Sequence, residues 1–333
     1  MSSTHSHANM PKISVIMPVL NREDTIEKAI QSVLDQQYDN VELIILDGGS
    51  KDKTIEIIKR HEQHIAYWHS QHDGSAAVAT NIGIGKATGD LVALLMADDF
   101  YEPGLFKNIA ASFIAHPDAD IFTCAGRIVA YDEEAQAYKT LAAFTSPREL
   151  ELTFYNICFG ASAICFRFIK RSLYERIGLY IPFGADKKHM LTNDKEFLLR
   201  AVLHDVKDIF VGQVGYTYLA HKESYSFGKH RATSIRHCIE HMYFAQQYLG
   251  NRKLSIKHKL LLIYWYNTES AKLLLFRLLD GDWHAASQAG ATGIRRYPFI
   301  WPVVFCITGC KIIFKQGMRK LRSLFPRQVV SQS

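Results

Sequence analysis

The sequence predicts an α/β fold in which helices flank a mostly parallel central sheet, followed by a C-terminal helical extension. Short apolar runs rich in β-branched residues alternate with segments of helical periodicity through the first hundred residues. With 333 residues and 48% hydrophobic content, the chain is long and apolar enough to bury a full core. Strands that alternate with helices indicate a sheet covered on both faces.

The first elements form a strand-helix-strand unit. ISVIM (Ile13 to Met17) and VELIIL (Val41 to Leu46) read as buried strands. The segment between them has apolar residues at helical spacing. These residues are Ile26, Ala29, Ile30, Val33 and Leu34.

Two more helices and one more strand are expected before residue 100. Ser50 or Asp52 is expected to cap a helix that turns Ile55 and Ile58 inward. A further helix around Ala76 to Ile84 leads to Gly89. The chain then enters a strand from Leu91 to Met96.

Polar turns follow three of these strands directly. They are Pro18 to Asn21, Asp47 to Ser50, and Asp98 with Asp99. Parallel sheets bind ligands beyond the carboxyl ends of their strands, so these turns are expected to converge on one rim. Carboxylates there suit Mg²⁺ or Mn²⁺ that also binds phosphate and water. The alternative is that Asp98 and Asp99 only begin a turn before Pro103.

The sequence lacks the motifs of two other nucleotide-binding classes. No G-x-G-x-x-G follows the first strand, and GIGKATG (Gly83 to Gly89) precedes a strand instead. A G-x-x-x-x-G-K-[ST] loop is also absent from the sequence. These observations argue against a dinucleotide-dependent dehydrogenase and a P-loop NTPase. The six cysteines form no C-x-x-C pair, which favours reduced thiols over a zinc site.

The net charge of +6 is concentrated in the C-terminal part. Fourteen Lys and Arg against three acids give the segment after residue 250 a net +11, which leaves −5 for the first 250 residues. The apolar run Pro298 to Phe314 contains Lys311 and is short of the roughly 20 residues that a bilayer span needs. We therefore expect peripheral membrane contact, in which Lys315, Arg319, Lys320 and Arg322 meet anionic headgroups. The alternatives are a helical cap packed on protein and, less in keeping with the sequence, a nucleic-acid patch without a recognisable module.

Several motifs together resemble one family. SVIMPVLNREDTIEKAIQSVLDQQYDNVELIILDGGSKDKT and HDGSAAVATNIGIGKATGDLVALLMADD are similar, in order and spacing, to family 2 inverting glycosyltransferases of GT-A fold. The polar first residues, MSSTHSHANMPK, indicate a flexible tail over residues 1–11, and the resemblance implies a GT-A domain over 12–230. The domain would have a nucleotide-sugar half (12–125) and an acceptor half (126–230), with a basic helical region over 231–333.

The resemblance also implies a donor site. Pro18, Val19, Leu20 and Asn21 match the family's P-x-Y-N turn along base and ribose, with Leu20 in place of the usual Tyr. Asp47 matches the acid that accepts a hydrogen bond from the base, commonly uracil, and Gly48 replaces the next acid. Thr80 stands where many members have Arg. The segment near the sugar and diphosphate is matched by Asp73, Gly74 and Asn81.

A divalent metal, Mn²⁺ or Mg²⁺, is the cofactor that the resemblance implies. Asp98 and Asp99 match the end of the family's D-x-D-D motif, and Met96 stands at its first acid. A thioether is a poor ligand for a hard cation, so Asp98 and particularly Asp99 are the expected ligands. His221 matches a histidine that closes over the diphosphate in some relatives and can ligate the metal. Lys222 and Ser224 on the same loop are further candidates for phosphate contact.

Asp194 matches the family's general base. It opens an expected helix that buries Phe197, Leu198, Ala201 and Val202. A carboxylate there accepts the proton of the acceptor hydroxyl while that oxygen attacks the anomeric carbon, which inverts its configuration. The alternative interpretation is an acid that only stabilises the start of the helix.

The resulting hypothesis is a cytoplasmic enzyme, peripheral on the inner face of the plasma membrane. It would transfer a sugar from a nucleotide-diphospho-sugar, with UDP as the expected nucleotide, to a glycan or lipid-linked acceptor in cell-surface polysaccharide synthesis. It would bind no nucleic acid, and a homo-oligomer is possible. One alternative is a sugar nucleotidyltransferase, although that class has a Gly-rich basic loop where PVLNRED stands. The other is a non-catalytic sugar-nucleotide-binding or scaffold protein.

Overall fold

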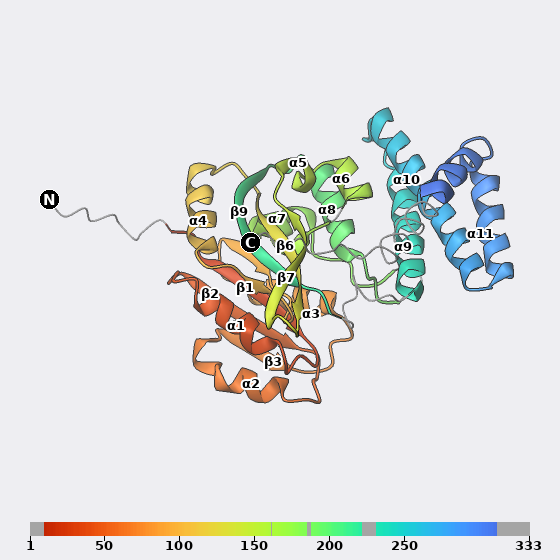
Figure 1. The fold of residues 1–333 in the computed structure, drawn as a ribbon. Helices are drawn as coiled ribbons and strands as arrows, with labels where there is room; N and C mark the ends of the chain where they lie inside the picture. Colours follow the sequence, from red (N-terminus) through yellow and green to blue (C-terminus); the bar gives the residue numbers. More distant parts are fainter. Residues whose placement is uncertain (1–9, 161, 185–187, 222–230, 312–333) are drawn as a thin grey trace, which may run out of the picture. The chain divides into compact units, whose positions relative to one another are not determined.

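The computed structural model describes residues 10–160, 162–184, 188–221 and 231–311 (Figure 1). The chain divides into two compact units, Met1–Gly228 and Lys229–Ser333. The first unit contains the sheet, and the second is helical throughout its described residues.

The described part of the first unit is built on one nine-stranded sheet, in the order β3-β2-β1-β4-β8-β6-β9-β5, with β7 paired to β6. Strands β3, β2, β1 and β4 are parallel, whereas β8 runs antiparallel to both of its neighbours, β4 and β6. Helices flank this sheet (Figure 1), which confirms the predicted α/β class. The strands are β1 (Ile13–Val19), β2 (Val41–Asp47), β3 (Tyr67–Ser70), β4 (Leu91–Leu94), β5 (Phe100–Tyr101), β6 (Ile121–Asp132), β7 (Ala137–Phe144), β8 (Arg167–Lys170) and β9 (Asp208–Leu219).

The expected helices of the first hundred residues are present, with one correction. The spacing of apolar residues in α1 places Ile26 and Val33 in the core. In α2 the buried pair is Ile57 and Ile58, and Ile55 is half-buried, so the expectation for Ile55 was wrong. The helices of this unit are α1 (Ile26–Leu34), α2 (Thr54–Arg60), α3 (Ala76–Lys86), α4 (Leu105–Ala115), α5 (Pro147–Leu150), α6 (Phe154–Phe159), α7 (Arg171–Ile177) and α8 (Asn193–Leu203), with short 3₁₀ turns η2 (Glu62–His64) and η3 (Ile164–Phe166).

The start of α2 shows how the two candidate caps are used. An Asp52 carboxylate oxygen accepts the Thr54 N–H at 3.0 Å, while the Ser50 hydroxyl donates to Asp47 instead. Asp52 therefore supports the helix start, and Ser50 belongs to the preceding turn.

The two proposed halves of the domain share one sheet. Strand β6 runs across the boundary at residue 125, and β8 inserts between β4 and β6. Helix α8 begins at Asn193 and buries Phe197, Leu198 and Ala201 as expected, whereas Val202 is only half-buried. The second half thereby holds the start of α8 on the same framework as the acidic turn after β4.

The described part of the second unit consists of α9 (Arg231–Leu249), α10 (Ile256–Leu279), α11 (Trp283–Arg296) and a helix over 301–311. Phe244, Trp265 and Trp301 lie in its interior. A Cβ on Gly293 would lie 2.0 Å from the Trp301 indole nitrogen, so this glycine allows the two helices to pack closely. Within the described residues, no helix combines the length and the apolar character needed to cross a bilayer.

Candidate functional site

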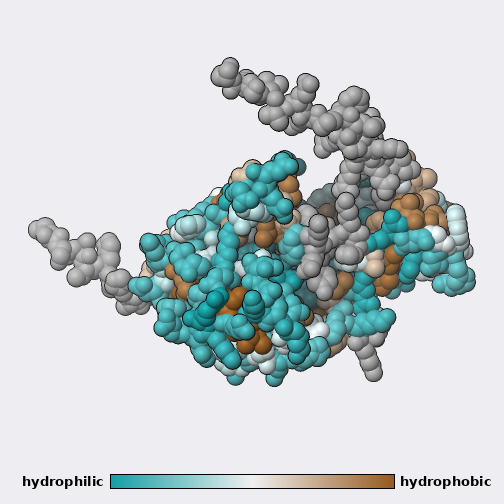
Figure 2. Space-filling view, turned by 60° about the horizontal axis from the view of Figure 1, so that its bottom comes forward, coloured by the Kyte–Doolittle hydropathy of each residue, from teal (hydrophilic) through white to brown (hydrophobic). Residues whose placement is uncertain are grey.

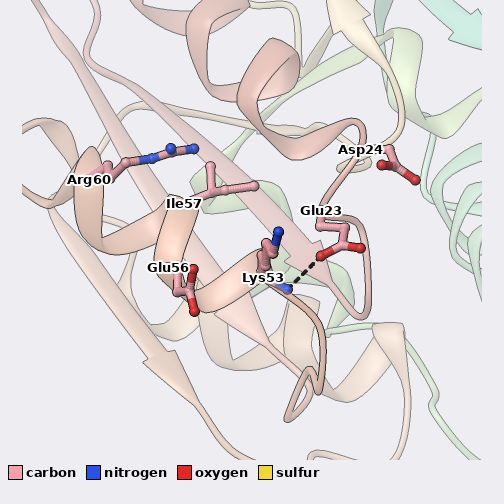
Figure 3. Close-up of a pocket in the computed structure, with 6 residues that line it drawn as sticks. All are labelled: Glu23, Asp24, Lys53, Glu56, Ile57 and Arg60. Carbon is pink, nitrogen blue, oxygen red and sulfur yellow. Dashed lines mark hydrogen bonds between the residues drawn. The ribbon is translucent and has the colours of Figure 1, made fainter.

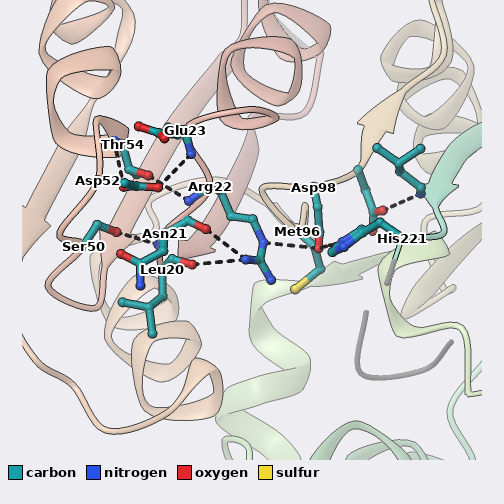
Figure 4. Close-up of polar contacts among 12 residues, drawn as sticks. Leu20, Asn21, Arg22, Glu23, Ser50, Asp52, Thr54, Met96, Asp98 and His221 are labelled. Carbon is teal, nitrogen blue, oxygen red and sulfur yellow. Dashed lines mark hydrogen bonds and ion pairs between the residues drawn. The ribbon is translucent and has the colours of Figure 1, made fainter. Parts of the chain in front are cut away.

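The turns after β1 and β2 are joined into one rigid rim. The Gly48 N–H donates to the Val19 carbonyl at 2.9 Å, and the Asn21 N–H donates to the Ser50 hydroxyl at 2.8 Å (Figure 4). Asn21 adopts a left-handed backbone conformation with φ 50°, which Asn tolerates better than most residues. Its side-chain oxygen accepts the Lys51 N–H at 2.9 Å. The sequence-predicted convergence of these two turns is therefore present.

Asp47 is fully buried at the end of β2 and organises its own turn. One carboxylate oxygen accepts the N–H groups of Gly49 at 3.1 Å and Ser50 at 3.0 Å and the Ser70 hydroxyl at 2.5 Å. The other accepts the Ser50 hydroxyl. These contacts fix the carboxylate of Asp47. The predicted hydrogen bond from the nucleotide base would therefore be accepted by a carboxylate that is already oriented.

The third turn meets the first through Arg22. The Arg22 Nε lies 3.4 Å from an Asp98 carboxylate oxygen, and the His221 Nε2 lies 2.8 Å from the same oxygen (Figure 4). The Asp98 side chain is 18% exposed and the His221 side chain 27% exposed. Residues from the ends of β1, β4 and β9 thus come together on the predicted rim.

Asp99 points the other way, into the core. Its side chain is buried and accepts hydrogen bonds from the Tyr216 hydroxyl at 2.6 Å and the Leu219 N–H at 2.9 Å. Burial, together with the nearby charge of Asp98, raises the pKa of Asp99 well above its usual range. Both oxygens of Asp99 are therefore engaged by β9, and Asp98 is the acid of the pair that faces the rim.

Met96 begins the tight turn that separates β4 from these acids. The Asp99 N–H donates to the Met96 carbonyl at 2.9 Å, and the Met96 N–H donates to the Tyr216 hydroxyl at 3.3 Å. Tyr216 thus binds both ends of the turn.

The residues at the rim fit a divalent cation that is completed by its substrate. A carboxylate from Asp98 and an imidazole from His221 supply two donors that face each other. No cluster of three or more His, Cys, Asp or Glu suitable for a metal occurs within the described ranges. Mg²⁺ and its relatives are commonly held by one or two protein carboxylates together with phosphate oxygens and water. Two protein ligands are therefore compatible with a metal ion that binds together with a diphosphate.

Asp194 lies in the first turn of α8 and receives the Ser162 hydroxyl at 2.5 Å. Burial raises the pKa of the Cys165 thiol, and the charges of Asp99, Asp194 and Asp98 raise it further. The turn η3, which contains Cys165, contacts α8, β4 and β9, so these three elements pack around one short segment.

The turn after β3 contacts the acceptor half. A Cβ on Gly74 (φ 83°) would lie 3.1 Å from the His189 ring, and the Asp73 carboxylate lies close to Gly48. Burial raises the pKa of Asp73. The amide of Asn81 is engaged at both ends by the backbone of Tyr180, to which it donates at 2.8 Å and from which it accepts at 3.1 Å. Asn81 therefore joins α3 to the segment that precedes α8.

Some site residues were not expected from the sequence, and some expectations find no place at the rim. Arg22, Ser162 and Tyr216 contact the predicted acids but were missed, and of these only Arg22 had a sequence signal, because it directly follows Asn21 in the first turn. Thr80, which stands where many members of the family have Arg, is 4% exposed on α3. Lys222 and Ser224 lie outside the described residues.

A separate hollow of about 230 Å³ lies at α2 and contains none of the predicted site residues (Figure 3). Its acids outnumber its bases, which disfavours binding of an anionic nucleotide. The Lys53 N–H donates to Glu23 across it at 2.8 Å. The lining residues are Glu23, Asp24, Lys53, Glu56, Ile57 and Arg60.

The sheet order, the acidic turn after β4 and the joined turns after β1 and β2 define a nucleotide-sugar transferase fold of GT-A type. Residues 14–178 match the family model "Glycosyl transferase family 2", and the chain belongs to this family. An uncharacterized glycosyltransferase of Haemophilus influenzae is 44% identical over 95 residues, which are 28% of this chain and 38% of that protein. The chain spans less than two thirds of the length of the first curated relatives that it matches, from 13% to 65%.

Two solved structures share the fold. The mannosyltransferase PcManGT from Pyrobaculum calidifontis, in complex with GDP-Man and Mn²⁺, is 18% identical and superposes with a TM-score of 0.57 over 96% of this chain and 88% of its own. TarS 1-349 from S. aureus, in complex with UDP-GlcNAc, is 14% identical with a TM-score of 0.54 over 92% of each chain.

Proposed function

We propose that the protein is an inverting glycosyltransferase that moves a sugar from a nucleotide-diphospho-sugar to a hydroxyl of a glycan or lipid-linked acceptor. The observation that carries this proposal is the pairing of Asp98 with His221 at the rim, where Arg22 from the turn after β1 also meets Asp98. The family supports the reaction class. A UDP-sugar is the proposed donor, and the complex of TarS with UDP-GlcNAc supports it by analogy.

Donor binding is assigned to the joined turns. The backbone of Pro18, Val19 and Asn21 would lie along base and ribose, with Asp47 at the base. Asp73 and Gly74 border the region of the sugar. Asp98 and His221 would hold a divalent metal, which supplies positive charge to the departing diphosphate when bound. The role of Asp99 is to fix the turn that presents Asp98, because both of its oxygens are engaged inside the protein.

Asp194 is the proposed general base. An alcohol is a weak nucleophile until its proton can leave, and a carboxylate within hydrogen-bond reach accepts that proton as the new bond forms. The hydrogen bond from Ser162 at 2.5 Å orients one oxygen of Asp194. Attack from the face opposite the diphosphate inverts the anomeric carbon, and no covalent sugar-enzyme intermediate is required.

The decisive experiment compares binding with turnover. Thermal shift with UDP, GDP and their sugar derivatives, with and without Mn²⁺, measures donor binding, and release of nucleoside diphosphate with a panel of glycan acceptors measures transfer. Asp194→Asn should keep donor binding and lower transfer by about 100-fold or more, the scale of general-base catalysis. Asp205→Asn is the matched control, because Asp205 is exposed just after α8 at φ 51°, a conformation that Asn adopts readily.

Three outcomes would contradict parts of this proposal. Normal transfer by Asp194→Asn would remove that residue as the base. Failure of every nucleotide to stabilise the wild type would remove the donor site. Donor binding by the wild type without turnover across the panel would favour a non-catalytic sugar-nucleotide-binding protein.

We also propose that the second unit attaches the enzyme peripherally to the cytoplasmic face of the plasma membrane, where polysaccharide precursors would be its acceptors. Phe299, Val303 and Ile307 recur every four residues and are 89%, 59% and 42% exposed. Arg295 and Arg296 lie next to this stripe in the sequence. Figure 2 shows exposed apolar residues beside hydrophilic ones on this unit. A helix that exposes an apolar stripe next to basic residues is typical of the membrane interface. The basic residues expected after Phe314 lie outside the described residues.

Sedimentation with lipid vesicles tests the attachment. Vesicles containing phosphatidylglycerol should retain the wild type more than neutral phosphatidylcholine vesicles do. The double variant Phe299→Ser, Val303→Ser should lose this retention, while Leu141→Ser, which removes a 53% exposed apolar residue from the first unit, should not. Equal retention of all three proteins would contradict the assignment.

A further inference from the structure

The rim that is proposed to hold the donor is rich in acids. Asp47, Asp73 and Asp98 all lie at the ends of strands around the joined turns. A nucleoside diphosphate brings additional negative charge to this place. The negative charges of these acids and of the phosphates repel each other. Binding of the diphosphate therefore requires positive groups in fixed positions near the phosphates.

Arg22 supplies a cation that the fold has fixed at this point. Its Nη1 donates to the Asn21 carbonyl at 2.9 Å and approaches the Leu20 carbonyl at 3.5 Å, and its Nε lies 3.4 Å from Asp98. The side chain is 23% exposed, so the guanidinium is neither buried in the core nor freely solvated. Its backbone is held too, because the Arg22 N–H donates to the Thr54 hydroxyl at 2.8 Å.

The Arg22 guanidinium lies between the two parts of the proposed donor site. On one side are Asn21 and Ser50, which form the turn assigned to base and ribose. On the other side are Asp98 and His221, the pair assigned to the metal (Figure 4). A diphosphate that joins a ribose at the first to a metal at the second passes beside Arg22.

We propose that Arg22 binds the donor diphosphate. Guanidinium matches phosphate well because its planar fork of N–H donors pairs with two oxygens and stays charged at every physiological pH. The ion pair with Asp98 orients the fork and couples it to the metal-binding pair. This inference rests on the proposed donor site, and it adds a phosphate-binding residue to that site.

Ligand-observed NMR titrations with UDP and with uridine, each in the presence of EDTA and again with diamagnetic Mg²⁺, test the role. Arg22→Gln should weaken UDP binding by roughly 10- to 100-fold, the usual value of a hydrogen bond to a charged group, and leave uridine binding unchanged. Arg22→Lys keeps the charge but loses the planar fork of N–H donors. Its UDP affinity should therefore lie between those of the wild type and Arg22→Gln. If the wild type binds GDP more tightly than UDP, the same titrations are made with GDP and guanosine.

The control is Arg60→Gln, which removes the same charge from an exposed side chain of α2 that pairs with Glu27 at 2.8 Å. It should bind UDP as the wild type does. An equal loss of UDP and uridine affinity in Arg22→Gln would show that Arg22 only shapes the turn and would overturn the inference, as would unchanged UDP affinity. A wild type that binds no nucleoside diphosphate would instead overturn the proposed function itself.

Discussion

Two neighbouring carboxylates at the end of β4 have different surroundings. Asp98 faces Arg22 and His221 at the rim, whereas Asp99 is buried against Tyr216 and the Leu219 N–H. The tight turn closed by the Asp99 N–H and the Met96 carbonyl directs the two side chains differently, so one acid can meet the ligand while the other anchors the turn. Asp99 also fixes the end of β9, two residues before His221, and thereby brings His221 to Asp98.

Tyr216→Phe tests this anchoring. The substitution removes the hydroxyl that donates to Asp99 and accepts from Met96, so the turn loses a contact at each end. We expect a loss of about 1–3 kcal/mol in the free energy of unfolding, because buried polar groups are left unpaired. Because the turn loosens, we also expect Mn²⁺ to bind roughly 10-fold more weakly in the presence of UDP, measured by electron paramagnetic resonance of free Mn²⁺.

Tyr101→Phe provides the comparison. Tyr101 is equally deep in the core, and its hydroxyl donates to the Leu94 carbonyl at 3.3 Å instead of to Asp99. It should lose stability and keep Mn²⁺ affinity. If both variants weaken Mn²⁺ binding alike, the effect of Tyr216 is general destabilisation, and the anchoring role fails.

The sequence predicts the acids of the site better than their partners. Asp98 could be located because it follows an apolar strand, and Asp194 because it matches the general base of the family that the sequence resembles. Tyr216 could not, because its contact with Asp99 depends on β9 pairing with β5 and β6 far away in the chain. The burial of Asp99 follows from the same pairing.

At the level of elements, Gly83 of α3 serves packing. The segment GIGKATG resembles a nucleotide-binding motif only by composition, and it lies at the end of a helix. A Cβ on Gly83 would lie 2.5 Å from the Ile16 Cγ2 in β1 and 3.0 Å from the Leu46 side chain in β2. Gly83 thus lets α3 lie directly on the parallel strands that carry the joined turns.

Gly83→Ala should therefore destabilise the protein despite the better helix propensity of alanine. The added methyl group meets a β-branched side chain that is fully buried, and such overpacking costs about 1–3 kcal/mol. Gly85→Ala, two residues further along the same helix, meets nothing within 4 Å and should gain about 0.5–1 kcal/mol. Urea denaturation of both variants measures the difference. A stabilised Gly83→Ala would show that α3 can move away from the sheet without cost.

The pattern of strands shows where prediction from sequence ends. The parallel strands β1, β2 and β4 were predicted because each is an apolar run between helices. Strand β8 has only four residues, RFIK, two of them charged, and its antiparallel place between β4 and β6 is set by tertiary contacts. Local periodicity contains no information about such an insertion.

At the scale of the whole molecule, each unit has a partly or fully buried acid whose pKa is shifted. In the second unit, burial raises the pKa of Glu269, but the His241 ring at 3.6 Å and the Lys272 ammonium at 2.7 Å outweigh burial and bring it down to about 2. In the first unit Glu42 on β2 behaves in the same way. Burial raises its pKa, while hydrogen bonds from Lys12, Ser14 and Thr88 lower it to about 2. Both units are therefore expected to lose stability in acid.

Glu42 connects three parts of the first unit. Its carboxylate accepts the Ser14 hydroxyl at 2.5 Å from β1 and the Thr88 N–H at 2.7 Å from the segment before β4, and it pairs with the Lys12 ammonium at 2.7 Å. The ordinary pKa of this group is 4.5. Because the folded pKa is lower than that of the unfolded chain, the unfolded state binds the proton more tightly at acidic pH. The stabilisation is complete above about pH 5 and is lost as the pH falls towards 2.

The expected contribution of Glu42 is on the order of 3 kcal/mol at neutral pH, which follows from the shift of its pKa. Glu42→Gln should lower the melting temperature at pH 7, and the difference from the wild type should shrink steadily between pH 5 and pH 3. Glu56→Gln, the same change on the exposed side of α2, should follow the wild type at every pH. Calorimetric melts across this range measure all three proteins. A difference between Glu42→Gln and the wild type that stays constant down to pH 3 would mean that the carboxylate charge of Glu42 does not hold these three segments together.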